Sequence, residues 1–146
     1  MKKQWVPIFS VLSFFGLPLF YLPVAAAIWM LDHAAGVRIF ASLLSIEAIG
    51  AAIKLVHPTE RPVPMPRRTL REKIDAGSFP SLHSARIAAL ALTIFRLQPT
   101  PLAGGALVAL ILAVSASRLS IKKHYPLDVV AGIAGGIIIN IIIFSF

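Results

Sequence analysis

Five long apolar segments, separated by short polar stretches, make up most of this 146-residue chain. They cover residues 5–31, 37–56, 81–97, 101–117 and 126–146. A transmembrane helix needs about 20 apolar residues, and a shorter segment can still span by thinning the bilayer locally. The hydrophobic fraction of 58% also exceeds what a soluble domain of this size can bury. We therefore predict an all-α, polytopic transmembrane helical bundle of about five spans, as a single domain over residues 1–146.

The first apolar segment allows two topologies. Gly16, Pro18 and Pro23 interrupt it, and they could either kink one long helix or close a re-entrant hairpin. Each arm of a hairpin would hold roughly a dozen residues, too few to span a bilayer. We favour one kinked span, and a hairpin would raise the number of membrane segments to six. Lys2 and Lys3 precede the run as in a secretory signal, but the run is too long for one.

Composition narrows the classes of partner and chemistry. There is no cysteine, which excludes disulfides, thiolate metal sites and thiol redox chemistry. The net charge of +8 is typical, in a membrane protein, of contact with anionic headgroups. No basic run is interleaved with aromatic residues, so we expect no nucleic-acid partner.

The largest polar stretch covers residues 57–79 and contains a local helix signal. Thr69 and Glu72 have the spacing of a capping box, and Gly77 is a typical helix stop. A short helix over 70–76 is predicted, either as a lid near a site or as a bridge between two spans.

Three polar fragments lie at the ends of apolar segments, so folding could bring them to one membrane surface. They are Lys54 with Arg61, then Pro80-Ser81-Leu82-His83, then Ser117-Arg118 with His124 and Asp128. Phosphoryl transfer needs cations to neutralise charge on three phosphate oxygens while a nucleophile attacks in line. The fragments supply such groups, and we expect a phosphate ester to be cleaved with no metal and no other cofactor.

Lys54, Arg61 and Arg118 would hold the phosphate, the arginines with bidentate geometry. Each alone is more often a snorkelling anchor. Ser81 opens an apolar segment, where its hydroxyl and the free N–H groups of a helix start suit an anion; a serine there is also an ordinary cap.

The two histidines and the aspartate suit acid–base and nucleophilic roles. His83 would protonate a departing alcohol oxygen. Asp128 could hold one nitrogen of His124 and leave the other free to attack phosphorus. Alternatively, Asp128 only offsets the positive end of a helix, and His124 is a boundary residue.

In order and spacing, these fragments resemble the signature of the type 2 phosphatidic acid phosphatase family, related to bacterial acid phosphatases and vanadium haloperoxidases. The resemblance covers residues 54–128. It implies that His124 is the nucleophile that forms a phosphohistidine, with Asp128 as its orienting partner and His83 as the general acid. The implied phosphate ligands are Lys54, Arg61 and Arg118, assisted by Ser81 and the backbone amide of Leu82.

Two features depart from that family. Leu82 stands where the family commonly has glycine, and its side chain is expected to narrow the pocket and alter the fit of the substrate. The chain before Lys54 also looks one span shorter than in the usual six-helix members, which leaves the orientation in the membrane open.

The predicted function is that of an integral membrane lipid phosphatase, in the cell membrane, acting on a lipid phosphate or diphosphate. Isoprenoid diphosphates and phosphatidate-type glycerolipids are the leading substrates. A transferase with the same site, or a non-catalytic protein that binds anionic lipids, is the alternative. The positive-inside rule assigns the site to the cytoplasm. Because cations of the site would be kept in either orientation, the side stays open.

Polar residues within the spans predict internal contacts. Glu47 and Arg86 are costly in a membrane unless they pair, and a salt bridge between them is expected beneath the site. Asn140 is expected to bond to a neighbouring helix. Lys122 and Lys123 would meet either the second phosphate of a diphosphate or anionic headgroups.

Overall fold

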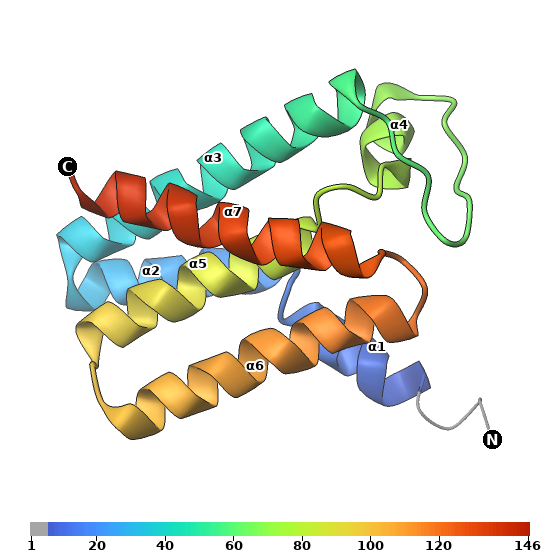
Figure 1. The fold of residues 1–146 in the computed structure, drawn as a ribbon. Helices are drawn as coiled ribbons and strands as arrows, with labels where there is room; N and C mark the ends of the chain where they lie inside the picture. Colours follow the sequence, from blue (N-terminus) through green and yellow to red (C-terminus); the bar gives the residue numbers. More distant parts are fainter. Residues whose placement is uncertain (1–5) are drawn as a thin grey trace.

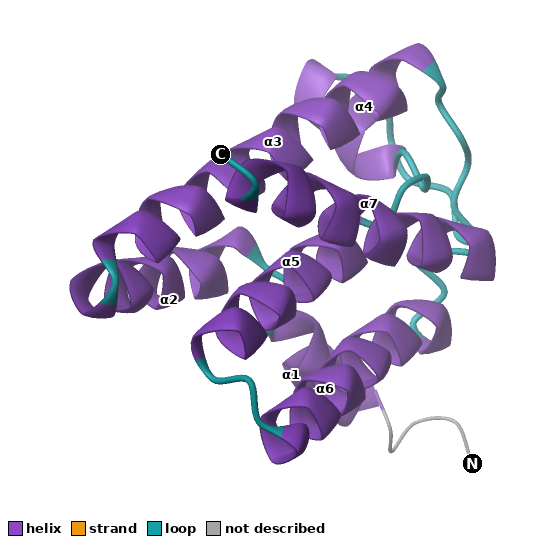
Figure 2. Ribbon diagram, turned by 60° about the vertical axis from the view of Figure 1, so that its left-hand side comes forward, coloured by secondary structure: helices purple, strands orange, loops and turns teal. Residues whose placement is uncertain are grey.

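The computed structural model describes residues 6–146, which form seven helices and no strand (Figure 2). The helices are α1 (Val6–Phe14), α2 (Pro18–Leu31), α3 (His33–Val56), α4 (Leu70–Ala76), α5 (Leu82–Leu97), α6 (Pro101–Ser120) and α7 (Pro126–Phe144). Lys2, Lys3 and the start of the first apolar segment at Trp5 lie outside the described residues. The long helices lie alongside one another, with α4 and the α6–α7 connection at the end opposite the C-terminus (Figure 1). The prediction of an all-α membrane bundle is confirmed.

Three described helices, α3, α6 and α7, are long and apolar enough to cross a membrane. Helix α2 is apolar but shorter. Helix α5 has only 16 residues, or about 24 Å at 1.5 Å per residue. It lies against α3, α6 and α7, and most of its side chains are buried. Because protein surrounds it, α5 does not need the length of a lipid-exposed span.

The first apolar segment is broken into two helices. Helix α1 ends at Phe14 and α2 begins with Pro18 in its first turn, a position that proline favours. Helix α1 packs on α6, whereas α2 packs on α3. The two halves therefore do not form a hairpin. The break lies at Gly16, and Pro23 is accommodated inside α2.

Helices α5 and α7 approach so closely that glycine is required between them. A Cβ added to Gly132 would collide with the carbonyl oxygen of Ser81, and one added to Gly136 with that of Ala85. A Cβ on Gly135 would meet nothing within 4 Å. The Gly132–Gly136 pair thus permits backbone contact, as predicted from its small-xxx-small spacing.

Two predicted polar contacts inside the bundle are confirmed. Arg86 forms a salt bridge with Glu47, and its Nη1 also donates to the carbonyl of Gly16 at 2.7 Å. Asn140 on α7 donates from Nδ2 to Thr93 Oγ1 at 2.9 Å on α5. Arg86 and Asn140 are thus each bonded to a neighbouring element.

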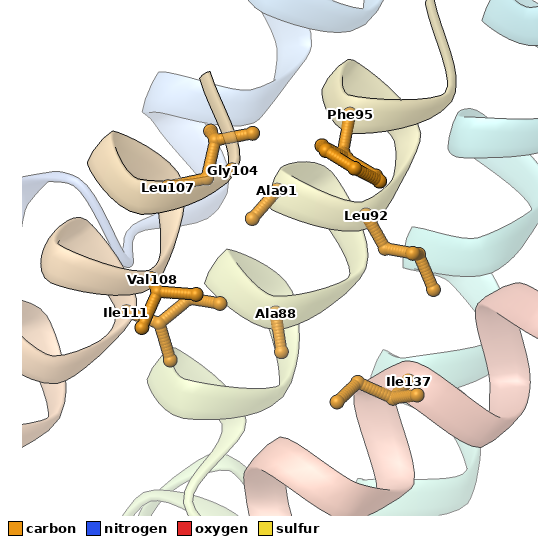
Figure 3. A pocket seen from close by; sticks show the side chains of 9 residues that line it. All are labelled: Ala88, Ala91, Leu92, Phe95, Gly104, Leu107, Val108, Ile111 and Ile137. Carbon is orange, nitrogen blue, oxygen red and sulfur yellow. The ribbon is translucent and has the colours of Figure 1, made fainter. Parts of the chain in front are cut away.

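An apolar cavity of about 280 Å³ lies between α5, α6 and α7. Figure 3 shows Ala88 and Ala91 of α5 between Val108 and Ile111 of α6 and Ile137 of α7. Its remaining lining residues are Leu92, Phe95, Gly104 and Leu107. Since no lining side chain is polar, this cavity suits hydrocarbon and not a phosphate.

Candidate active site

The sequence fragments meet at the end of the bundle that carries α4 (Figure 1). Lys54 is in the last turn of α3, Arg118 in that of α6, and Asp128 in the first turn of α7. Lys54, Arg118, His124 and Asp128 are each at most 5% exposed. His83 and Arg61 are half-buried beside them. Charged groups buried to this extent need partners, which makes the cluster a candidate site.

The imidazole of His124 is held in one tautomer. Its Nδ1 lies 2.8 Å from the backbone carbonyl oxygen of Ser78. A carbonyl can only accept, so Nδ1 carries the proton and Nε2 keeps its lone pair. Burial and the positive charges of Arg118, Arg61 and Lys54 together lower the pKa of His124 from 6.5 to about 3. At neutral pH the ring is therefore uncharged, and Nε2 is available as a nucleophile.

Asp128 reaches His124 through Ser78. Its Oδ2 accepts from the Ser78 hydroxyl at 2.5 Å and from the Tyr125 N–H at 2.8 Å. The same oxygen lies 3.7 Å from His124 Nδ1, which is too long for a hydrogen bond. Ser78 thus serves both residues, its carbonyl for His124 and its hydroxyl for Asp128. Sequence reasoning missed Ser78, although it lies two residues before the Pro80 fragment.

Ser81 is engaged as the cap of α5. Its side chain accepts from the Ser84 backbone N–H, and its own N–H donates to the Asp128 carbonyl at 2.9 Å. The Leu82 N–H is the first of the helix and has no carbonyl one turn earlier to bond. Leu82's side chain lies against Gly50 of α3 in a hydrophobic cluster. This side chain thus packs against α3, and its effect on the fit of the substrate stays a prediction.

The arginines have donors that the protein does not use. Nε of Arg61 and Nε of Arg118 are buried and have no hydrogen-bond partner among the described residues. Burial lowers the pKa of Arg61, partly offset by the carboxylates of Asp75 and Asp128. Unpaired buried donors are costly, and an oxyanion would satisfy them. No three His, Asp or Glu side chains within residues 6–146 lie close enough to share a metal ion.

A threonine fastens the loop that carries Arg61. The Thr59 carbonyl accepts from the N–H of Ser78 at 3.1 Å and from Arg67 Nη2 at 3.0 Å. Its hydroxyl accepts from the Phe79 N–H at 2.8 Å. The loop is therefore bonded directly to the residues that orient His124. The predicted capping box of α4 is present, and this short helix lies in the same polar stretch, after the loop that carries Arg61.

Comparison with known proteins agrees with this arrangement. The PAP2 superfamily model matches residues 35–146. The chain belongs to the PAP2 superfamily. The crystal structure of Aquifex aeolicus LpxE is similar over 100% of this chain and 88% of its own, at 17% identity and a TM-score of 0.84. Comparison with curated proteins gives no significant match.

A second similar structure carries the family's name. It is a transmembrane PAP2-type phosphatidylglycerolphosphate phosphatase from Bacillus subtilis, aligned over 100% of this chain and 78% of that one. The identity is 17% and the TM-score 0.80. The PAP2 fold is thus shared, and the resemblance predicted from three fragments is confirmed.

The PAP2 match begins after the first two helices, yet α1 and the break that follows it reach the site. Arg118 Nη1 donates to the Ser13 hydroxyl at 3.1 Å, and Gly16 lies against the ring of His83. Sequence reasoning recognised Gly16 only as an interruption of an apolar run. Ser13 gave no signal, because one serine in an apolar helix is unremarkable.

Proposed function

We propose that this protein is a membrane lipid phosphatase that hydrolyses a lipid phosphate or diphosphate through a phosphohistidine on His124. The observation that supports it best is the pairing of a neutral imidazole with unfilled cationic donors. His124 has a free Nε2, and the adjacent Arg61 and Arg118 each have a buried Nε without a partner among the described residues. An anion with several oxygens is the ligand that such donors suit.

The reaction follows from these positions in two steps. Phosphate oxygens would bind Arg61, Arg118 and Lys54 while Nε2 of His124 attacks phosphorus. As the N–P bond forms, the bond from phosphorus to the lipid oxygen breaks, and His83 gives that oxygen a proton. A bound phosphate favours the protonated form of His83, because the opposite charge lies nearby.

The second step restores the enzyme. His83, now neutral, takes a proton from a water molecule as the water oxygen attacks phosphorus. The N–P bond breaks, inorganic phosphate leaves, and the imidazole of His124 is neutral again with its proton still on Nδ1. Ser78 supports both steps, since its carbonyl keeps that proton in place.

A lipid substrate agrees with the position of the site. The cations lie at the end of helices able to cross a membrane, so an amphiphile can present its phosphate while its tails stay in the bilayer. The apolar cavity between α5, α6 and α7 could receive part of a hydrocarbon chain (Figure 3). Phosphatidate-type glycerolipids and isoprenoid diphosphates are the leading candidates, in the cell membrane.

Phosphate release from purified protein in detergent tests this function. The panel holds prenyl diphosphates and glycerolipid phosphates, and an added alcohol separates hydrolysis from transfer. His124→Ala should abolish turnover. His33→Ala should not, because His33 is the first residue of α3 and packs on Trp29 at the end of that helix opposite Lys54. Orthovanadate should inhibit, and EDTA should leave activity unchanged. Full activity of the His124→Ala protein, or strict dependence on a metal, would overturn the proposal.

A further inference from the structure

The break between α1 and α2 contacts two different parts of the site. We call residues 13–16 the elbow, from Ser13 in the last turn of α1 to Gly16 before α2. Helix α1 packs on α6, which carries Arg118 in its last turn. The elbow lies outside the 35–146 match and outside the three polar fragments.

The hydroxyl of Ser13 is oriented so that its lone pair faces Arg118. Ser117 Oγ lies 2.6 Å from the Val114 carbonyl and donates its proton there. Ser117 Oγ can therefore only accept from Ser13 Oγ, 3.1 Å away. With its own proton committed, Ser13 accepts from Arg118 Nη1 at 3.1 Å. This bond holds one edge of the guanidinium, whereas its buried Nε has no partner within residues 6–146.

Gly16 makes room for the second histidine. A Cβ at Gly16 would lie 2.6 Å from Cδ2 and 2.9 Å from Cγ of His83. Real Cβ contacts are longer than this, so any larger residue would move the ring. The Gly16 carbonyl is fixed in turn by Arg86 Nη1 at 2.7 Å, and Arg86 is held by Glu47. The salt bridge within the bundle thus fixes the elbow against His83.

We propose that the elbow is a fourth part of the active site. Ser13 is a positioning residue for Arg118, and Gly16 is a positioning residue for His83. This inference rests on the proposed phosphatase function. The inference adds a segment N-terminal to the matched region to the site. Through Arg118, Ser13 would affect phosphate binding; through His83, Gly16 would affect proton transfer.

Ser13→Ala tests the first assignment. The substitution removes the hydroxyl that accepts from the charged Arg118 guanidinium. We expect orthovanadate binding to weaken roughly tenfold. The readouts are the inhibition constant and the rise in melting temperature that vanadate causes, which does not depend on turnover. Ser13→Thr keeps the hydroxyl and should restore both. Ser120→Ala is the matched control, because the exposed hydroxyl of Ser120 donates to the carbonyl of Ala116 in its own helix.

Gly16→Ala tests the second assignment. Displacing His83 should lower kcat/KM, which reports the steps up to the phosphohistidine, far more for a lipid phosphate than for p-nitrophenyl phosphate. The departing lipid alcohol needs a proton, whereas nitrophenolate leaves without one. Gly105→Ala is the control, since a Cβ there meets nothing within 4 Å.

If the Ser13→Ala protein fails to fold, Ser13→Cys keeps the volume with a weaker acceptor.

The outcomes separate the two proposals. If His124→Ala abolishes turnover but Ser13→Ala binds vanadate as the wild type does, and Gly16→Ala lowers kcat/KM equally for both substrates, the elbow inference is overturned and the phosphatase stands. If the His124→Ala protein remains active, the proposed function fails and the elbow inference fails with it.

Discussion

The imidazole of His124 and the carbonyl of Ser78, 46 positions apart in sequence, are joined by a 2.8 Å hydrogen bond. The carbonyl belongs to the loop between α4 and α5, whereas the histidine precedes α7. Because the acceptor is part of the main chain, it fixes the tautomer without contributing a charge. The Ser78 side chain has a separate task, since its hydroxyl satisfies Asp128.

Ser78→Ala separates those two tasks. The carbonyl bond to His124 remains, but Asp128 loses a buried donor, a change worth about 1–3 kcal/mol. We expect kcat to fall by roughly tenfold or more, and Ser78→Ala and Asp128→Asn to be less than additive when combined. Steady-state kinetics of the two single variants and the double variant check this. A normal kcat for Ser78→Ala beside a disabled Asp128→Asn protein would show that Asp128 acts without Ser78.

Acid should destabilise the folded protein partly through His124. The pKa is lowered from 6.5 to about 3 by burial and by nearby cations. Between those two values the unfolded chain binds a proton that the folded state does not, so the free energy of unfolding falls as the pH drops from 6.5 toward 3. His124→Asn removes this contribution and should lose less stability in that window. Melting temperatures in detergent at pH 7 and pH 4.5 measure it; parallel slopes for both proteins would contradict it.

The α5–α7 contact predicts opposite effects for neighbouring glycines. Alanine normally stabilises a helix by about 0.5–1 kcal/mol relative to glycine. At Gly132 and Gly136 the new Cβ would collide with the Ser81 and Ala85 carbonyls, so the melting temperature should fall. Gly135→Ala enters open space and should be neutral or stabilising. Thermal unfolding of the three alanine variants measures this. Equal changes in melting temperature at positions 132, 135 and 136 would contradict the backbone contact.

Loss of the Glu47 carboxylate should loosen the elbow. The Arg86 side chain is 6% exposed and that of Glu47 is 42% exposed. Removing the carboxylate should therefore lower the free energy of unfolding by about 2 kcal/mol, between the values for surface and buried ion pairs. Glu47→Ala should lower both the melting temperature and turnover. Glu60→Ala, in the exposed loop, is the control. Wild-type stability and activity in the Glu47→Ala protein would rule out a supporting role for the pair.

Parts of this molecule could be predicted because they depend on local pattern. Apolar length predicted the three described helices that are long enough to span, and the Gly132–Gly136 spacing predicted a close helix contact. The equal depths of Glu47 and Arg86 predicted their pairing. Each prediction needed only the helical repeat and the cost of burying charge.

Other parts depend on which surfaces meet, which the sequence alone does not reveal. Ser78 matters through a carbonyl that every residue possesses, so its identity carried no signal. Ser13 matters because α1 happens to pack beside Arg118. The first apolar run was expected to kink at Gly16, Pro18 or Pro23. The sequence did not distinguish these positions, and the structure breaks at Gly16 while Pro23 lies inside α2.

Leu82 and Gly50 together occupy one fixed volume between α5 and α3, because the leucine methyls fill the space that a second Cβ would need. A glycine in place of Leu82 would open a void unless the residue at position 50 were larger. Drift at either position is therefore constrained by the other, and the two should be exchanged as a pair when sequences of this kind are recombined.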